Sequence, residues 1–146
     1  MGKGEFAGFP KGLIGFLEDV AAHNEKSWFE AHRADYESLY LEPGRAFTEV
    51  MAERLDKELR PATFDGPMTG SLFRIFRDTR FSKDKTPYKT HLAVSWGEEG
   101  RAKGEGLGFY FHLQPGSVMV GAGAHAFSKE VLAAYRDAVV DPTRGP

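Results

Sequence analysis

The residues best suited to chemistry are six Lys and Arg side chains gathered in one short segment near the middle of the chain. The segment from Ser71 to His91 has a charge of +4, because it also holds two Asp, whereas the whole 146-residue chain has a charge of -2. The rest of the chain therefore sums to -6. Such a concentration of cations predicts either an anion-binding site or an element held together by ion pairs. The cations are Arg74, Arg77, Arg80, Lys83, Lys85 and Lys89.

The favoured hypothesis is a site for a phosphate-bearing or other anionic ligand, either a small molecule or a nucleic acid. The planar fork of Arg matches phosphate and carboxylate oxygens, and Lys adds a compact charge. The two Asp can orient individual basic side chains, and Phe81 and Tyr88 lie between the charges, where they can stack on a base or sugar. The predicted ligand-binding residues are Arg74, Arg77, Asp78, Arg80, Ser82, Lys83, Asp84, Lys85, Tyr88 and Lys89.

The alternative hypothesis is a structural or protein-interaction domain in which the same segment is an ion-paired brace. It predicts that Arg77 and Asp78 are largely buried and bonded to each other or to backbone carbonyls. A phosphodiesterase or nuclease is a further alternative, although no nucleophile activator or metal-binding carboxylate cluster is recognisable in the sequence. Whether the protein is an enzyme stays open at this point.

Other side chains with useful chemistry are few. The absence of Cys excludes thiol nucleophiles and Cys-based metal sites. No pair of the five His has the spacing of a helical zinc motif, so no metal or cofactor is predicted. Tyr110 and His112 alternate along one predicted strand and share a face, and both can transfer protons. Together with Trp28, they are the predicted walls of a pocket beside the basic segment.

The first half of the chain predicts the helices that must support this segment. Apolar residues recur at spacings of three and four over 13–20, which indicates one amphipathic helix. A second helix is expected to start at Ser27, with a capping box to Glu30, and to be interrupted at Pro43. A third helix follows and is expected to end at Arg60.

The second half predicts strands, because the apolar period falls towards two. A loop is expected over 64–70 and a Gly-rich connection over 97–106, and a last helix starts at about Ser128. Helices segregated from hairpin-linked strands predict an α+β fold, with N-terminal helices packed on an antiparallel sheet and a C-terminal helix. The predicted strands are 72–76, 92–96, 107–113 and 118–120.

Composition places the chain among globular proteins. A length of 146 residues with 41% hydrophobic residues suits one α+β domain over 1–146. The N-terminus lacks the apolar core of a signal peptide, and no stretch is long and apolar enough to span a membrane, so a cytoplasmic protein is expected. The charge of -2 argues against nucleic-acid binding over the whole surface of the protein, so any such binding must be local.

The segment over 77–89, Arg-Asp-Thr-Arg-Phe-Ser-Lys-Asp-Lys-Thr-Pro-Tyr-Lys, resembles the hallmark of a widespread uncharacterised bacterial family, the domain-of-unknown-function family 2461. The resemblance covers nearly the whole chain, and it differs at 23–24, where the family has a pair of Asn and this chain has His-Asn. It implies kinship and carries no established reaction. Family members continue past the last predicted helix, which implies that this chain is either a fragment of a longer domain or a short variant. Further matching pieces are Phe9-Pro10, Trp28-Phe29, Tyr36, Pro43, Phe73-Arg74-Ile75 and Gly121-Ala-Gly123.

Overall fold

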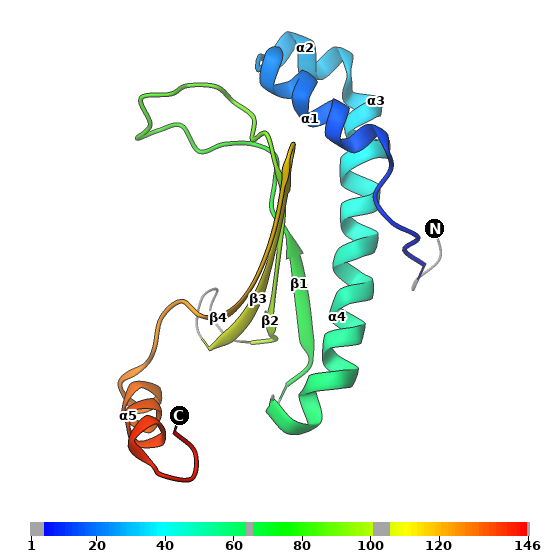
Figure 1. Ribbon diagram of the computed structural model, residues 1–146. Helices are drawn as coiled ribbons and strands as arrows, with labels where there is room; N and C mark the ends of the chain where they lie inside the picture. The colour runs from blue at the N-terminus through cyan, green and yellow to red at the C-terminus, as the bar shows by residue number, and fades with distance from the viewer. Residues whose placement is uncertain (1–4, 64–65, 101–105, 146) are drawn as a thin grey trace.

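The helical half of the chain comes first and ends in one long helix. The computed structural model describes residues 5–63, 66–100 and 106–145. Its first elements are α1 (Gly12–Ala22), α2 (Lys26–Ala31), α3 (Arg33–Asp35), the π-helical segment η1 (Tyr36–Leu41) and α4 (Glu42–Thr63). The three short helices cluster at one end of the molecule, and α4 runs from them along the sheet (Figure 1).

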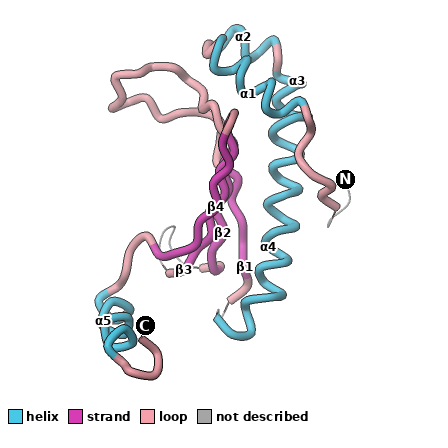
Figure 2. The backbone as a smooth tube through the Cα atoms, viewed as in Figure 1, coloured by secondary structure: helices cyan, strands magenta, loops and turns pink. Residues whose placement is uncertain are grey.

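Four strands follow and form one antiparallel sheet in sequential order. They are β1 (Met68–Leu72), β2 (Leu92–Glu98), β3 (Leu107–Gln114) and β4 (Ser117–Ala124), and α5 (Lys129–Val140) is the last element. Helix α4 lies against one face of the sheet, whereas α5 lies on the other side (Figure 1, Figure 2). The predicted α+β fold, with helices on an antiparallel sheet and a C-terminal helix, is therefore confirmed.

The hydrophobic core lies between the helices and the sheet. The apolar stripe predicted over 13–20 is buried in α1 as expected. Alternate residues of β2 point to the same side, and Leu92, Val94 and Trp96 are buried there. The indole Nε1 of Trp96 donates to the carbonyl of Thr48 at 2.9 Å, which fixes α4 against the sheet.

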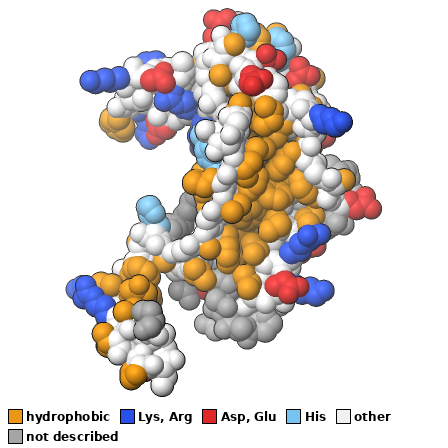
Figure 3. All heavy atoms as spheres, viewed as in Figure 1, with side chains coloured by type: hydrophobic (Ala, Val, Ile, Leu, Met, Phe, Trp, Pro, Cys, Tyr) orange, Lys and Arg blue, Asp and Glu red, His pale blue; other side chains and the backbone are white. Residues whose placement is uncertain are grey.

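Among the described residues, no helix packs on the other face of the sheet. Its side chains are small, with a few aromatic rings among them. Ser71, Ser95, Tyr110 and Gly121 are neighbours in one row that crosses all four strands on this face. The molecule is hollowed on this side, between the loop that joins β1 to β2 and α5 (Figure 3).

Most of the large hydrophobic side chains that stay exposed belong to β4, α5 and the short segment between them. The apolar side predicted for the last helix exists, but it faces solvent and covers no part of the core. No helix among the described residues is long and apolar enough to cross a membrane. The exposed residues of this region are Val118, Met119, Val120, Phe127, Val131, Tyr135, Val139 and Val140.

Three predicted features of the helices are wrong. The N-cap of α2 makes no side-chain bond, and the helix starts before Ser27, so the capping box to Glu30 does not form. Pro43 does not interrupt the second helix. The wider turn of η1 ends at Leu41 and leads into α4, and Pro43, which lacks an N–H, is the second residue of α4. Helix α4 continues to Thr63, past the predicted end at Arg60, since a proline restricts the preceding residue without forbidding helical geometry.

The first predicted strand is misplaced. Strand β1 covers 68–72, and the chain leaves the sheet where 72–76 was predicted, so Arg74 is not a strand residue. Two glycines around β1 concealed the strand, although Met68 is buried against the helices. The predicted loop over 64–70 is therefore partly strand, and its residues 64 and 65 lie outside the described residues.

The other three strands were predicted but are longer than expected. Strand β4 continues through Gly121 and Gly123, which have low β propensity. In the turn before β4, Gly116 has φ +77, the positive value that a type II turn requires at its third position. Residues 101–105 of the predicted Gly-rich connection lie outside the described part of the chain.

Candidate functional site

The basic segment forms a long loop between β1 and β2, and we call residues 73–91 the basic arm. It projects away from the helices at one end of the sheet (Figure 1). Its base is a short antiparallel pairing: the N–H of Arg77 donates to Pro87 at 2.8 Å, and the N–H of Lys89 donates to Ile75 at 2.7 Å. Ile75 and Tyr88 are buried, so the base of the basic arm belongs to the core. The arm is a folded projection of the body of the protein.

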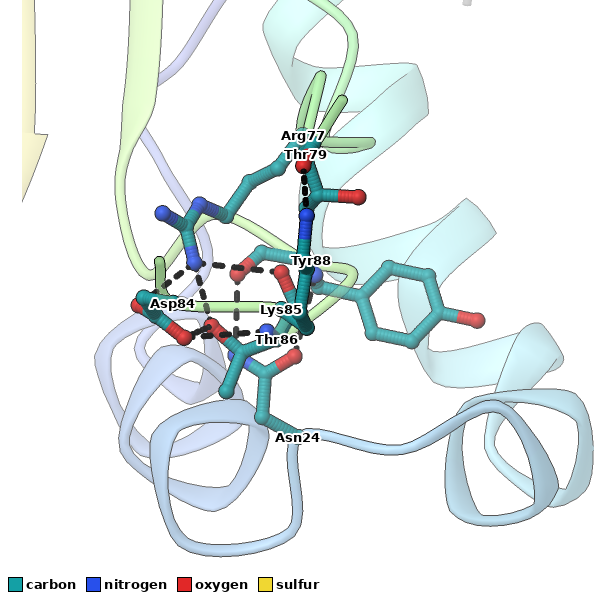
Figure 4. Close-up of polar contacts among 7 residues, drawn as sticks. All are labelled: Asn24, Arg77, Thr79, Asp84, Lys85, Thr86 and Tyr88. Atoms are coloured by element: carbon teal, nitrogen blue, oxygen red, sulfur yellow. Dashed lines mark hydrogen bonds and ion pairs between the residues drawn. The ribbon is translucent and has the colours of Figure 1, made fainter. Parts of the chain in front are cut away.

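Two polar side chains from the helices hold the basic arm in place. The hydroxyl of Tyr40 lies within 3.4 Å of the carbonyl of Phe73 and 3.3 Å of the carbonyl of His91, which are the two ends of the arm. Burial raises the pKa of Tyr40, so this hydroxyl stays a donor. Asn24, between α1 and α2, bonds both backbone groups of Tyr88 (Figure 4).

Arg77 is the centre of a polar network inside the basic arm (Figure 4). Its Nη1 donates to Asp84 Oδ2 at 2.6 Å, to the carbonyl of Thr86 at 3.1 Å and to the Thr86 hydroxyl. Asp84 Oδ1 accepts from the N–H and the hydroxyl of Thr86, both at 2.9 Å. The bonds from Thr86, and then the one from Arg77, lower the pKa of Asp84 to about 2. The guanidinium therefore braces the arm through Nη1, while its Nε and Nη2 have no partner among the described residues.

Arg80 and Asp78 form a second, exposed pair near the tip of the basic arm. Arg80 donates from Nε and Nη2 to the two carboxylate oxygens of Asp78, at 2.9 and 2.7 Å. These bonds lower the pKa of Asp78, and the Arg80 side chain is still 77% exposed. The guanidinium also lies 5.7 Å from the ring centroid of Phe81. That ring is 95% exposed, so the tip presents an aromatic face and a cation together.

The remaining four cations differ in how they are engaged. Lys85 donates to the carbonyl of Thr79, and Lys89 donates to the carbonyl of Arg74, both at 2.7 Å. These bonds use one of the three ammonium protons of each Lys. The side chains of Arg74 and Lys83 have no hydrogen-bond or ion-pair partner among the described residues.

Arg77 and Asp78 are not bonded to each other, whereas Arg77 does bond a backbone carbonyl, that of Thr86, as the brace hypothesis also allowed. The arm doubles back at its tip, which brings Arg77 beside Asp84, whereas Asp78 reaches Arg80 two residues further on. Asp78 is exposed, and Arg77 is the partly buried member of the set. Two other predicted residues of the arm differ in their exposure to a ligand. The ring of Tyr88 is buried, which removes it as a stacking surface. Ser82 lies in the turn at the tip of the arm.

The bare face of the sheet forms the second part of the candidate site, and we call it the sheet hollow. It has a volume of about 880 Å³. Phe73, at the base of the basic arm, lies in its wall and meets Tyr110 edge to face, with 6.3 Å between the ring centroids. The hollow therefore adjoins the arm. Its side chains include Thr69, Ser71, Phe73, Ser95, Tyr110 and His125.

A chain of hydrogen bonds runs along β3 at the border of the sheet hollow. The hydroxyl of Tyr110 lies 3.1 Å from Nδ1 of His112, and Nε2 of His112 lies 2.9 Å from Oε1 of Gln114. The Gln carbonyl can only accept, so Nε2 carries the proton and Nδ1 accepts from Tyr110. His91 stacks on His112 at 4.3 Å, and its pKa is lowered to about 4 by burial, by His112 and by Lys89. The tyrosine hydroxyl is thus held by a chain of hydrogen bonds.

The third predicted pocket wall, Trp28, lies elsewhere. Its ring is stacked between His23, at 5.5 Å, and His32, at 4.0 Å, on the helical side of the molecule. Among the described residues no group of three His, Asp or Glu is placed to hold a metal ion. The nuclease and phosphodiesterase alternatives therefore stay predictions, with no metal centre located among the described residues.

The sequence interpretation missed several residues of the site. Asn24 and Thr86 hold the basic arm, and Phe73, Ser71 and Ser95 line the sheet hollow. The family's Asn at the position of Asn24 was the available signal for the first of them. The hollow residues gave no signal, because they depend on the register between strands far apart in sequence.

Comparison with known proteins bears on the family alone. Neither the curated proteins nor the solved structures gave a match to this chain. One family model, described as conserved hypothetical protein (DUF2461), matches residues 12–145. That range holds the basic arm, the sheet and all five α-helices. The chain therefore belongs to the DUF2461 family of conserved hypothetical proteins.

Proposed function

We propose that the protein binds nucleic acid through the basic arm, with phosphates held by its cations and a base stacked on Phe81. The observation that carries this proposal is the tip of the arm. Phe81 is 95% exposed, Arg80 lies over its ring, and Lys83 has no partner among the described residues. An exposed large aromatic ring costs solvation free energy, and its position beside cations gives it a use as a stacking surface.

The shape of the basic arm supports a polymer over a small phosphate-bearing molecule. The arm projects from the body, and its tip residues are exposed, so they offer no enclosure to a single small ligand. Small-molecule sites bury most of their ligand in a concave surface. A polymer needs no such enclosure, because its repeated phosphates contact several cations at once.

The bonds within the basic arm support the same proposal. Arg77, Asp84 and Thr86 link the two sides of the arm, so little conformational entropy is lost when a ligand binds at the tip. This network also supports the alternative of an ion-paired brace. The two roles use different residues, since the brace uses Arg77 and the binding surface uses Arg80, Phe81 and Lys83.

Fluorescence anisotropy with a labelled single-stranded DNA of 15 nucleotides, measured across a salt series, tests the proposal. We expect binding that weakens with salt, with a slope of about -0.7 per phosphate contact. Phe81→Ala should weaken binding by roughly tenfold, and Phe81→Trp should retain it, because stacking contributes about 1–3 kcal/mol per base. Binding that is absent, or that is the same for wild type and Phe81→Ala, would overturn the proposal.

A further inference from the structure

We propose that the sheet hollow is a platform on which the bases of a single nucleic-acid strand lie while the basic arm holds its phosphates. This inference rests on the function proposed above and extends it to a second surface. Four observations carry it: the aromatic rings of the hollow, its hydroxyl row, its open floor and the charge at its border.

The first observation is that the aromatic rings of the sheet hollow are fixed in place. Tyr110 meets Phe73 at an interplanar angle of 77°, so the two rings present surfaces at right angles to each other. The hydroxyl of Tyr110 is held by His112, which is held in turn by Gln114. A ring in a fixed orientation offers a base a stacking surface without first being ordered.

The second observation is a row of hydroxyl groups. Ser71, Ser95 and Tyr110 are direct neighbours on three adjacent strands. Adjacent strands lie about 4.8 Å apart, which spaces the three side chains evenly across the hollow. The Ser71 and Ser95 hydroxyls can donate and accept, and the Tyr110 hydroxyl, which donates to His112, can still accept. The row can therefore pair with the mixed donors and acceptors on the edge of a base.

The third observation is the open floor beside Tyr110. Gly121 is the cross-strand partner of Tyr110, and a Cβ at Gly121 would have no atom within 4 Å. Its φ is not positive, so neither the backbone nor the packing requires glycine there. Glycine weakens a strand interior, and it often marks a place where a ligand approaches the backbone closely.

The fourth observation is the charge at the border of the sheet hollow. Lys89 Nζ lies 5.6 Å from the centroid of the Phe73 ring and donates to the carbonyl of Arg74. The hollow is therefore continuous with the cationic base of the arm, which complements a phosphate backbone. The bases of a duplex have their faces covered by neighbouring pairs, so the occupant must be a single strand.

Three probes and three variants test the platform. The probes are a labelled single-stranded DNA of 15 nucleotides, the duplex of the same sequence, and inorganic polyphosphate added as a competitor that has phosphates but no bases. Gly121→Val fills the floor at a position where an added Cβ meets no atom within 4 Å, Tyr110→Ala removes the ring, and Val120→Thr changes the opposite face of the same strand. We expect the first two variants to weaken single-strand binding about tenfold and to leave competition by polyphosphate unchanged. Val120→Thr should bind as wild type, and the duplex should bind more weakly than the single strand.

The outcomes that differ from this expectation overturn either the platform alone or both proposals. If both hollow variants bind the single strand as wild type, the platform is overturned, while the function of the arm stands on its own Phe81 result. If the wild type binds polyphosphate and single strand equally, the platform is also overturned. If it binds neither probe, both proposals fail. Thermal unfolding of Gly121→Val checks that a loss of binding does not come from a loss of folding. A β-branched residue at this position should not lower the melting temperature.

Discussion

Asn24 bonds both backbone groups of Tyr88, although 64 positions separate the two residues in the sequence. Its Nδ2 donates to the Tyr88 carbonyl at 2.8 Å, and the Tyr88 N–H donates to its Oδ1 at 2.9 Å. The side-chain amide thus takes the place of a neighbouring strand. The Tyr88 ring meanwhile stacks on Phe29 of α2, with 4.1 Å between centroids. These contacts fix the base of the basic arm to the helices.

Replacing Asn24 by Ala should destabilise the protein. The substitution leaves the N–H and the carbonyl of Tyr88 without their partner in a partly buried place, at a cost of about 1–3 kcal/mol. Urea denaturation measures the free energy of unfolding, and Glu25→Ala, at the exposed neighbouring position, is the control. Equal stability of Asn24→Ala and the control would show that the pairing contributes nothing.

Gly70→Ala should destabilise the protein, whereas Gly97→Ala should not. A Cβ at Gly70 would lie 2.5 Å from Thr48 Cγ2 and 2.6 Å from the Trp96 ring, where α4 meets the sheet. Overpacking of this kind costs about 1–3 kcal/mol. A Cβ at Gly97, on the bare face, meets no atom within 4 Å. Thermal unfolding of the two variants checks the contrast, and an unchanged melting temperature for Gly70→Ala would contradict the packing described here.

Arg77→Ala and Arg80→Ala should affect different properties. Arg77 is the partly buried centre of the arm network, so its loss should lower stability by about 1–2 kcal/mol. Arg80 is exposed, and among the described residues its only ion-pair partner is Asp78, so its loss should leave the unfolding midpoint unchanged and weaken binding of single-stranded DNA. Denaturation and anisotropy on both variants measure the two effects. The reverse pattern would contradict this assignment, because it would show that Arg80 braces the arm and that Arg77 binds the ligand.

Stability should fall as the pH is lowered from about 6.5 to about 4, in part because of His91. Its pKa in the folded protein is about 4, chiefly through burial, whereas an unfolded His titrates near 6.5. The unfolded chain therefore binds a proton in this window that the folded chain does not, which favours unfolding. The ring is partly exposed, so we expect roughly 1–2 kcal/mol.

The comparison of wild type with His91→Phe isolates this effect. The phenyl ring keeps a stacking surface for His112 and cannot take up a proton. Urea denaturation at pH 7 and pH 4.5 should show a smaller loss of stability for the variant than for wild type. Parallel losses in the two proteins would mean that His91 does not contribute.

The sequence predicted the elements whose signals are local. The stripe over 13–20 and the alternation over 107–113 identified α1 and β3, because the core faces of both elements are regular. Strand β1 was misplaced because glycine interrupts its pattern and its position is set by pairing with β2. Pro43 was taken as a helix break because a π-helical turn is not visible in a sequence.

The candidate site was predicted in part for the same reason. The basic arm was found because its cations lie close together in the sequence. The bond of Arg77 to a backbone carbonyl was predicted and is found at Thr86. Its ion pair with Asp84 was missed, since the doubling back of the arm decides between Asp78 and Asp84. The sheet hollow could not be predicted, because it exists only when the four strands are in register.

The most direct test of the account compares two double variants that remove the same charge from different places. Arg80→Ala with Lys83→Ala changes the tip of the basic arm, and Lys26→Ala with Arg33→Ala changes the exposed surface of α2 and α3. The measurement is the salt dependence of single-stranded DNA binding by anisotropy. We predict that the tip variant binds more weakly and that its slope is smaller by about 1.4, which is 0.7 for each lost contact, while the helix variant resembles wild type. Equal slopes in the two variants would contradict binding through the basic arm.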